Sequence, residues 1–240
     1  SAGSLGGSQP LPGDGSGVLI DDVRVVATNS LSTFTENGTA VAIATANSLA
    51  FDGNGATLNS ATITLTNAQT GDQLLVNGLT TATGTLTGGI AYTISGNTVT
   101  LTGAGTETNY AAAIRAISFS NTTENPNTTQ RVINVTVSDG AQTSNTAVAR
   151  INVVAVNDTP TITAPASYSG SEDTALTLNG LTMADVDAGG SSVQLTISVP
   201  AGVGTLNFAA TPFITVLNNG TGTVTLQGQR AAIVNAVNSG

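Results

Sequence analysis

The side chains that could do chemistry in this chain of 240 residues are almost all acidic. There are 14 Asp and Glu residues against five basic residues, all of them Arg, and the chain has no His and no Cys. The acidic residues gather in a few short motifs, and the candidate ligands there are Asp139, Asn157, Asp158, Glu172, Asp173, Asp185 and Asp187. Carboxylate and amide oxygens grouped in this way are the ligands that Ca²⁺ prefers, so calcium is the expected cofactor.

A cation would also relieve a repulsion between these carboxylates. If the motifs lie at strand ends and domain junctions, close pairs would repel one another by about 1–4 kcal/mol each. Asp and Asn before Gly are also ordinary turn formers, and that alternative stays open for each motif. An EF-hand is excluded, because the twelfth position counted from Asp185 is Thr196, where that loop requires Glu.

The composition excludes several classes of function. Without His or Cys, the chain cannot form Ser–His or Cys–His nucleophiles, zinc clusters or disulfides. The formal net charge of −9 argues against nucleic-acid binding, because a run of phosphates requires a cluster of cations. No apolar stretch approaches the length of a membrane span, so we expect no membrane insertion by this segment.

No enzyme activity is expected. Glu107 and Glu124 could form a carboxylate pair for hydrolysis, but no pattern indicates the cleft that such a pair needs, and we interpret both as loop residues. The Asp-Thr-Ala sequence at 173–175 is a single imperfect match to the aspartic-protease motif, which occurs twice in such enzymes.

Short strands are the elements that must position the acidic motifs. Alternating runs rich in Val, Ile and Thr, separated by Gly, Asn, Asp or Pro, predict an all-β fold of antiparallel Ig- or cadherin-like β-sandwiches. Two segments, 109–116 and 230–237, are expected to form short helices. The predicted strands are Val18–Val26, Ser60–Thr66, Thr83–Leu86, Asn97–Thr102, Arg131–Val137, Ala147–Val156, Val193–Val199, Thr205–Phe208 and Gly222–Leu226.

The sequence repeats itself at an interval of roughly 130 residues. The matches that show this are Val23–Asn29 with Ile151–Asn157, Glu36 with Glu172, Thr39–Ala40 with Thr174–Ala175, Phe51–Asp52 with Ala184–Asp185, Ser60–Leu65 with Ser192–Ile197, Gly84–Leu86 with Gly204–Leu206, and Thr98–Gly103 with Thr223–Gly228. By this correspondence Glu36, Asp52 and Asn54 are further candidate calcium ligands in the first repeat.

These matches predict a domain organisation. Residues 1–17 are Gly-, Ser- and Pro-rich and are expected to be a flexible linker. Residues 18–29 match the last strand of a repeat, 30–156 form one complete sandwich, and 157–240 form a second sandwich without its closing strands.

Such an incomplete sandwich would expose unpaired backbone groups along one strand. Either the sequence is a cut from a longer array, or the segment 18–27 of one copy completes the next copy. The candidate donor residues are Val18, Ile20, Val23 and Val25.

The order and spacing of the motifs resemble the cadherin-like tandem domains of large bacterial surface proteins and adhesins. In the animal cadherin pattern, calcium lies between successive domains and is held by an early Glu, a D-x-D loop, an acidic strand-end segment and an N-D linker followed by Pro. Glu172, Asp185 with Asp187, Asp139, and Asn157–Asp158 with Pro160 occupy those places here. The L-D-R-E segment and the full D-x-N-D-N linker of that pattern are missing.

The resemblance implies a non-catalytic, extracellular or cell-surface segment, in which calcium stiffens an adhesive stalk. The partners would then be calcium, neighbouring repeats or copies of the chain, and a cell-surface or matrix ligand. An alternative is a self-assembling subunit of a filament, sheath or surface layer joined head to tail by strand donation. A third alternative is a ligand-binding adhesin tip, against which the eight Phe and Tyr residues and the absence of Trp argue.

Overall fold

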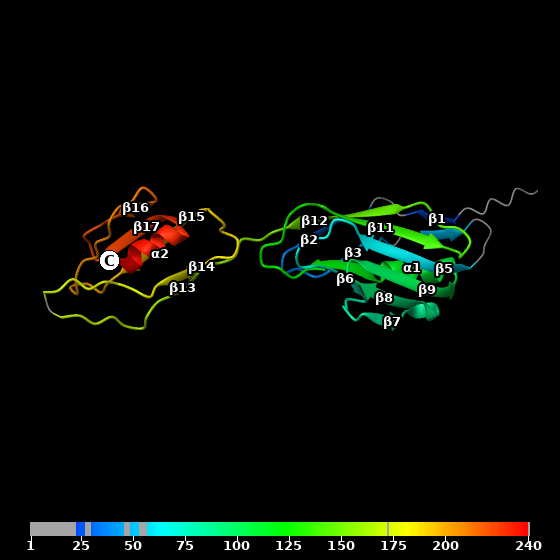
Figure 1. The fold of residues 1–240 in the computed structure, drawn as a ribbon, viewed down its shortest axis with the longest axis horizontal. Coiled ribbons are helices and arrows are strands. Elements are labelled where there is room, and N and C mark those ends of the chain that lie inside the picture. The colour runs from blue at the N-terminus through cyan, green and yellow to red at the C-terminus, as the bar shows by residue number, and fades with distance from the viewer. Residues whose placement is uncertain (1–22, 27–29, 46–48, 53–56, 172, 240) are drawn as a thin grey trace, which may run out of the picture. The chain divides into compact units, whose positions relative to one another are not determined.

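The structure, a computed structural model, describes residues 23–26, 30–45, 49–52, 57–171 and 173–239, and at 23–26 and 49–52 it describes the backbone. The chain divides after Val154 into two compact units. The described residues form mostly strands, with two α-helices, which agrees with the all-β class expected from the sequence (Figure 1).

The first unit contains a seven-stranded sheet with the order β2-β12-β11-β5-β9-β8-β7 and a three-stranded sheet with the order β3-β10-β6. Neighbouring strands are antiparallel except for β2, which runs parallel to β12. The elements are β1 (Val23–Val26), β2 (Leu31–Thr35), β3 (Val41–Ala42), β4 (Leu49–Asp52), β5 (Leu58–Leu65), β6 (Asp72–Val76), β7 (Thr83–Thr85), the 3₁₀ turn η1 (Thr87–Gly89), β8 (Ala91–Ser95), β9 (Thr98–Gly105), α1 (Glu107–Arg115), β10 (Ile117–Asn121), β11 (Arg131–Ser138) and β12 (Ala147–Val154).

The seven-stranded and three-stranded sheets of the first unit share one hydrophobic core. Burial alternates along β11, where every second side chain from Arg131 to Val137 is buried, because successive side chains of a strand point to opposite faces. Phe34 of β2 and Phe119 of β10 come from different sheets and meet edge to face, with ring centroids 5.6 Å apart. The first unit is therefore built as two layers of strands around aliphatic and aromatic side chains.

Helix α1 begins at a defined cap. The hydroxyl of Thr106 accepts a hydrogen bond from the backbone N–H of Asn109, with Glu107 in the first turn and Arg115 in the last. The helix buries Tyr110 and Ile114 against the core.

The second unit has a smaller core. A three-stranded sheet with the order β15-β17-β16 and the pair β13-β14 accompany one helix, and the buried residues include Leu195, Val224, Leu226 and Ile233. The elements are β13 (Thr161–Thr163), β14 (Thr182–Ala184), β15 (Ser192–Ser198), β16 (Ile214–Leu217), β17 (Thr223–Gln229) and α2 (Arg230–Ser239).

Two expectations differ from the structure. The predicted strand Thr205–Phe208 is absent, and only Leu206 forms a single bridge, with Thr221. Residues 23–26, assigned from the sequence to a preceding repeat, pair in this chain with β4, with Val23 opposite Asp52 and Val26 opposite Leu49. The repeat match identified a strand but not its partner, because pairing depends on the segments that the fold brings alongside it.

Candidate metal centre

Glu36 lies at the end of the first unit where β12 finishes, which we call the exit end. The parallel register of β2 and β12 sets Thr35 beside Val154, and the N–H of Glu36 donates a 2.9 Å hydrogen bond to the carbonyl of Val154. The side chain of Glu36 is only 4% exposed. Burying a carboxylate is costly unless cations or hydrogen bonds offset the loss of water, so this position favours a positive neighbour.

Glu124 reaches the same exit end from the loop after β10. Asn37 follows Glu36 with a left-handed backbone (φ 57°), a conformation that Asn tolerates better than most residues. Its side-chain amide donates a 2.8 Å hydrogen bond to Oε2 of Glu124. This bond holds the exposed carboxylate of Glu124 beside the turn that carries Glu36.

A buried ion pair anchors the loop that carries Glu124. Nε of Arg131 lies 2.6 Å from Oδ2 of Asp72, and both side chains are fully buried. The same guanidinium donates to the carbonyls of Thr129 and Asn127, while the side chain of Asn121 donates to Oδ1 of Asp72. Both ends of the loop between β10 and β11 are thus tied to one charged pair.

In the second unit, strand register brings Asp158 to Asp187. Thr161 pairs with Ala184 in the antiparallel β13–β14 ladder, and continuing this register places residue 158 opposite residue 187. The N–H of Asp158 donates a 2.9 Å hydrogen bond to Oδ2 of Asp187. The structure therefore brings these two predicted ligands together.

The electrostatics of Asp187 favour its ionised form. The hydrogen bond from the backbone of Asp158, with a further contribution from the side chain of Asp185, lowers the pKa of Asp187 below its ordinary value. Its Oδ1 atom is buried and has no hydrogen-bond partner among the described residues. An ionised carboxylate with a buried oxygen of this kind is suited to coordinate a cation.

Asp185 supports the same loop of the second unit. Its Oδ1 accepts a 3.0 Å hydrogen bond from the N–H of Ala188, and its carbonyl accepts one of 2.8 Å from Arg230. These contacts fix the turn that presents Asp187.

Glu36 and Glu124, both in the first unit, offer carboxylate oxygens within 4.8 Å of each other, which is close enough for one metal ion. Their hard oxygen atoms suit Ca²⁺, which accepts carboxylates in a loose geometry.

Two of the predicted ligands lie elsewhere. Asp139 follows the end of β11, four residues beyond the pair Val135–Ala147, and β12 runs from Ala147 to the exit end for eight residues, so Asp139 lies more than about 23 Å from the exit end. Its Oδ1 instead accepts hydrogen bonds from the N–H groups of Ala141 and Gln142, which is the turn-forming role left open from the sequence.

Asp173 lies on the long loop between β13 and β14, which runs away from these strands and returns (Figure 1). The hydroxyl of Tyr168 donates to the carbonyl of Asn179 and joins the two arms of this loop, with Asp173 between them. The structure does not bring Asp173 to Asp158 and Asp187.

The remaining predicted residues give less information. The side chain of Asn157 is exposed and donates a 2.8 Å hydrogen bond to the carbonyl of Asp158. Glu172, Asn54, Val18 and Ile20 lie outside the described residues, and of Asp52, Val23 and Val25 the structure describes the backbone in β4 and β1.

Sequence reasoning interpreted Glu124 as a loop residue and missed its place beside Glu36. The available signal was its position in the Asn- and Pro-containing loop between two predicted core segments. No repeat match marked it, because the matching segments lie on either side of this loop.

No protein-family model matches the chain, and neither does any curated protein. The described helices include none that is both long and apolar enough to span a membrane.

Proposed function

We propose that the chain is a non-catalytic segment of an extracellular, cadherin-like repeat protein. We further propose that Ca²⁺ stiffens the segment of chain that connects its two units. The ion would be held by Glu36 and Glu124 of the first unit and by Asp158, with Asp187 supporting Asp158. The two-layered strands of the first unit and the internal sequence repeat support this interpretation. The scarcity of charge and the absence of Lys suit a surface that is exposed to proteases.

The observation that carries the proposal is the hydrogen bond from Glu36 to the carbonyl of Val154. Asp158 follows Val154 by four residues, and four residues of extended chain span at most about 14 Å. Covalent connectivity therefore keeps Asp158 within reach of the exit end, where Glu36 and Glu124 lie.

The energetics of such a site favour a cation. Two carboxylates about 4 Å apart repel by about 4 kcal/mol at an effective dielectric constant near 20, and a divalent ion replaces this repulsion by attraction. An ion that binds the folded chain alone would add about 2.7 kcal/mol of stability at a concentration of 100 times Kd. It would also restrict the linker, which is the mechanical role that we propose.

Thermal unfolding of the whole chain with calcium, with magnesium and with EGTA tests this function. Calcium should raise the Tm in a saturable way and EGTA should reverse the rise, with a smaller response to magnesium, which demands a stricter octahedral site. Small-angle scattering should show a narrower distribution of end-to-end distances with calcium than with EGTA. A Tm and a scattering profile that do not respond to calcium would refute the proposal.

A second candidate function, assembly by strand donation, is favoured by the second unit. Strand β15 has β17 as its only neighbour among the described residues, whereas β5 of the first unit lies between β9 and β11. An edge with unpaired backbone groups can accept a strand from another copy. The proposed donor includes β1, which would first have to leave β4.

Light scattering at increasing protein concentration separates the two candidates. Donation predicts polymers that an excess of a peptide covering residues 18–27 shortens, whereas the stalk predicts a monomer at every concentration.

A further inference from the structure

Asn37 is linked to both carboxylates of the first unit that could share a metal ion. It follows Glu36 in the chain, and its side-chain amide donates a 2.8 Å hydrogen bond to Oε2 of Glu124. The carboxylates of Glu36 and Glu124 offer oxygen atoms within 4.8 Å of each other. Asn37 therefore contacts one candidate ligand through its side chain and is joined covalently to the other.

A tight turn fixes the backbone at Asn37. The N–H of Gly38 donates a 2.8 Å hydrogen bond to the carbonyl of Thr35, so Asn37 is the third residue of a four-residue turn, and its φ is 57°. A positive φ at this place is typical of a type II turn, in which Gly and Asn are the preferred residues. Gly would satisfy the backbone equally well, but it has no side chain to reach Glu124.

The chain that leads to Glu124 is held separately. The side chain of Asn121 accepts a 2.8 Å hydrogen bond from the N–H of Thr123 and donates one of 2.8 Å to the carbonyl of Thr70. These bonds fix the backbone up to Thr123 and leave the direction of the Glu124 side chain to its own contacts. Among the described residues, the amide of Asn37 provides the hydrogen bond that holds this side chain.

We propose that Asn37 is a positioning residue of the calcium site, whose amide holds the carboxylate of Glu124 beside Glu36 and whose neutrality keeps the charge of the ligands low. This role rests on the proposed function, because it requires Glu36 and Glu124 to hold the ion. Side chains that hydrogen-bond to metal ligands orient those ligands, and their loss typically lowers metal affinity by about 10- to 100-fold. Because the affinity for Ca²⁺ depends on the charge of its ligands, a neutral residue here favours a weak site, with a Kd of about 10⁻⁴–10⁻³ M as in extracellular modules.

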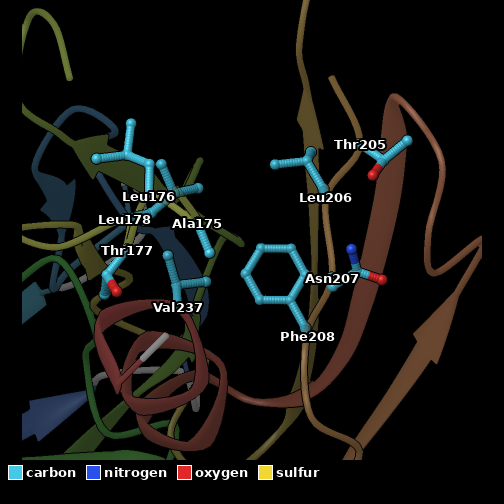
Figure 2. Close-up of a pocket in the computed structure, with 9 residues that line it drawn as sticks. All are labelled: Ala175, Leu176, Thr177, Leu178, Thr205, Leu206, Asn207, Phe208 and Val237. Atoms are coloured by element: carbon cyan, nitrogen blue, oxygen red, sulfur yellow. The ribbon is translucent and has the colours of Figure 1, made fainter. Parts of the chain in front are cut away.

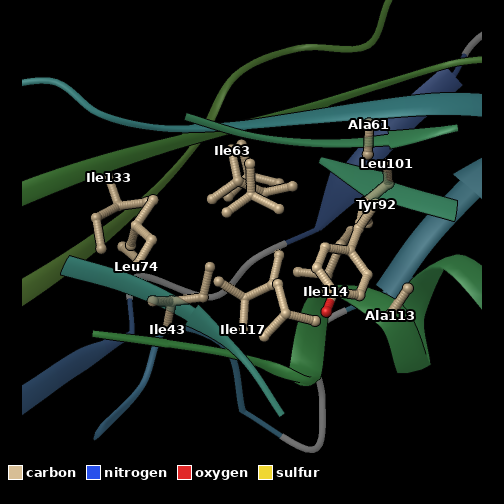
Figure 3. Packing of buried hydrophobic residues seen from close by; sticks show 14 of the residues in the cluster. Ile43, Ala61, Ile63, Leu74, Tyr92, Leu101, Ala113, Ile114, Ile117 and Ile133 are labelled. Carbon is tan, nitrogen blue, oxygen red and sulfur yellow. The ribbon is translucent and has the colours of Figure 1, made fainter. Parts of the chain in front are cut away.

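The second unit has an Asp at the equivalent place of the repeat. The N–H of Thr174 donates a 3.3 Å hydrogen bond to the carbonyl of Ser171, and Asp173, the third residue of this turn, has a φ of 58°. In both units the chain continues from the turn to an apolar residue that packs in or against the core, Leu178 in the second unit (Figure 2) and Ile43 in the first (Figure 3). Asp in place of Asn in the first unit should therefore preserve the turn while it replaces the amide donor with a third carboxylate.

Two substitutions at Asn37 separate its side chain from the shape of the turn. Asn37→Gly keeps the left-handed backbone and removes the hydrogen bond, so calcium affinity should fall by about tenfold. Asn37→Asp adds a full negative charge, so calcium affinity should rise by about tenfold, because the attraction of a divalent ion for this charge exceeds the loss of one hydrogen bond. Isothermal titration calorimetry of the whole chain with calcium chloride measures both changes.

Asn37→Asp should also have opposite effects on stability in chelator and in calcium, which a purely structural role of the side chain would not produce. In EGTA three carboxylates repel one another, so the Tm should lie below that of the wild-type chain. Saturating calcium should then raise the Tm by more than it raises that of the wild-type chain. A rise equal to that of the wild-type chain would overturn the proposal.

Asn77 provides the matched control. It has a left-handed backbone as well, with a φ of 51°, in an exposed turn of the same unit. Val76 of β6 pairs with Ile117 at the start of β10, so Asn77 lies at that end of β10, whereas Glu124 follows the other end. Asn77→Gly and Asn77→Asp should therefore leave calcium affinity unchanged.

The outcomes distinguish this role from the proposed function. If the wild-type chain binds calcium and Asn37→Gly binds it with the same Kd, the positioning role is wrong and the calcium site stands. If Asn77→Gly weakens binding as much as Asn37→Gly does, a general loosening of turns explains the loss, and the positioning role is again wrong. If the wild-type chain does not bind calcium, the proposed function fails and the positioning role fails with it.

Discussion

The backbone N–H of Asp158 donates a 2.9 Å hydrogen bond to Oδ2 of Asp187 across 29 residues of sequence. The bond continues the β13–β14 register beyond its last ladder pair. Because an N–H donor interacts more strongly with a carboxylate than with a carboxylic acid, folding and ionisation of Asp187 support each other.

This coupling predicts that the free energy of unfolding depends on pH when a chelator keeps the protein free of calcium. The pKa of Asp187 is lowered from its ordinary value of 3.8, so its contribution is complete above about pH 5 and is lost as the pH falls through the lower folded value. The variant Asp187→Asn should have a shallower loss of unfolding free energy below about pH 4, measured by urea unfolding. An NMR titration of the Asp187 carboxyl carbon should report the lowered pKa directly. An unchanged pH slope in the variant, or an ordinary pKa, would contradict the coupling.

Calcium affinity should depend on the carboxylates of the exit end and of Asp158. Glu36→Gln and Asp158→Asn should each weaken calcium binding by about tenfold, because each removes one negative ligand and keeps the size of the side chain. Asp139→Asn is the matched control, since it removes a carboxylate more than about 23 Å from the exit end and should leave the affinity unchanged. Isothermal titration calorimetry measures all three variants. Equal losses in the control and in the other two would indicate a general charge effect and no defined site.

The buried pair of Arg131 and Asp72 should be important for the stability of the first unit. Asp72→Asn leaves the guanidinium buried without its counter-charge and should cost about 3–5 kcal/mol of unfolding free energy. Arg150→Met, on the neighbouring strand and exposed, should change the free energy by less than about 1 kcal/mol. Urea unfolding measures both. A small effect of Asp72→Asn would mean that the loop carrying Glu124 is anchored in another way.

Tyr110 should make the stability of the fold sensitive to high pH. Its hydroxyl donates a 2.8 Å hydrogen bond to the carbonyl of Gly103, and burial raises its pKa to about 12. The neutral phenol therefore stabilises the fold fully below about pH 10, and this contribution is lost as the pH rises toward 12. Tyr110→Phe should cost about 1 kcal/mol at neutral pH and remove this loss at high pH. Tyrosinate absorbance of the folded protein gives an independent reading, and ionisation of Tyr110 near pH 10 would contradict the prediction.

The sequence identified the internal repeat but aligned one pair of equivalent strands two residues out of register. Sequence similarity aligned Thr64 with Thr196, through the match of Ser60–Leu65 with Ser192–Ile197. In the structure, Thr62 pairs with Thr100, and Thr196 pairs with Thr225, which is the repeat equivalent of Thr100. The true equivalent of Thr196 is therefore Thr62. A shift of two residues keeps every side chain on the same face, so the hydrophobic pattern cannot detect it.

The sequence by itself determined the strand class, most of the strands, both helices and the restricted chemistry of the chain. These features are local, because alternation and capping depend on residues that are neighbours in the chain. It also predicted Asp158 and Asp187 as candidate calcium ligands, since both stand in short acidic motifs.

The tertiary structure alone decided which acidic residues share an end of a unit. Each antiparallel strand returns the chain to the opposite end, so Asp139, after β11, and Val154, at the end of β12, are separated by the length of a strand. Glu36 reaches Val154 only because β2 lies parallel to β12, and Glu124 reaches Glu36 through a bond to Asn37. These contacts depend on which strands pair with each other, and those strands lie far apart in the chain. A local sequence pattern carries no information about such pairing.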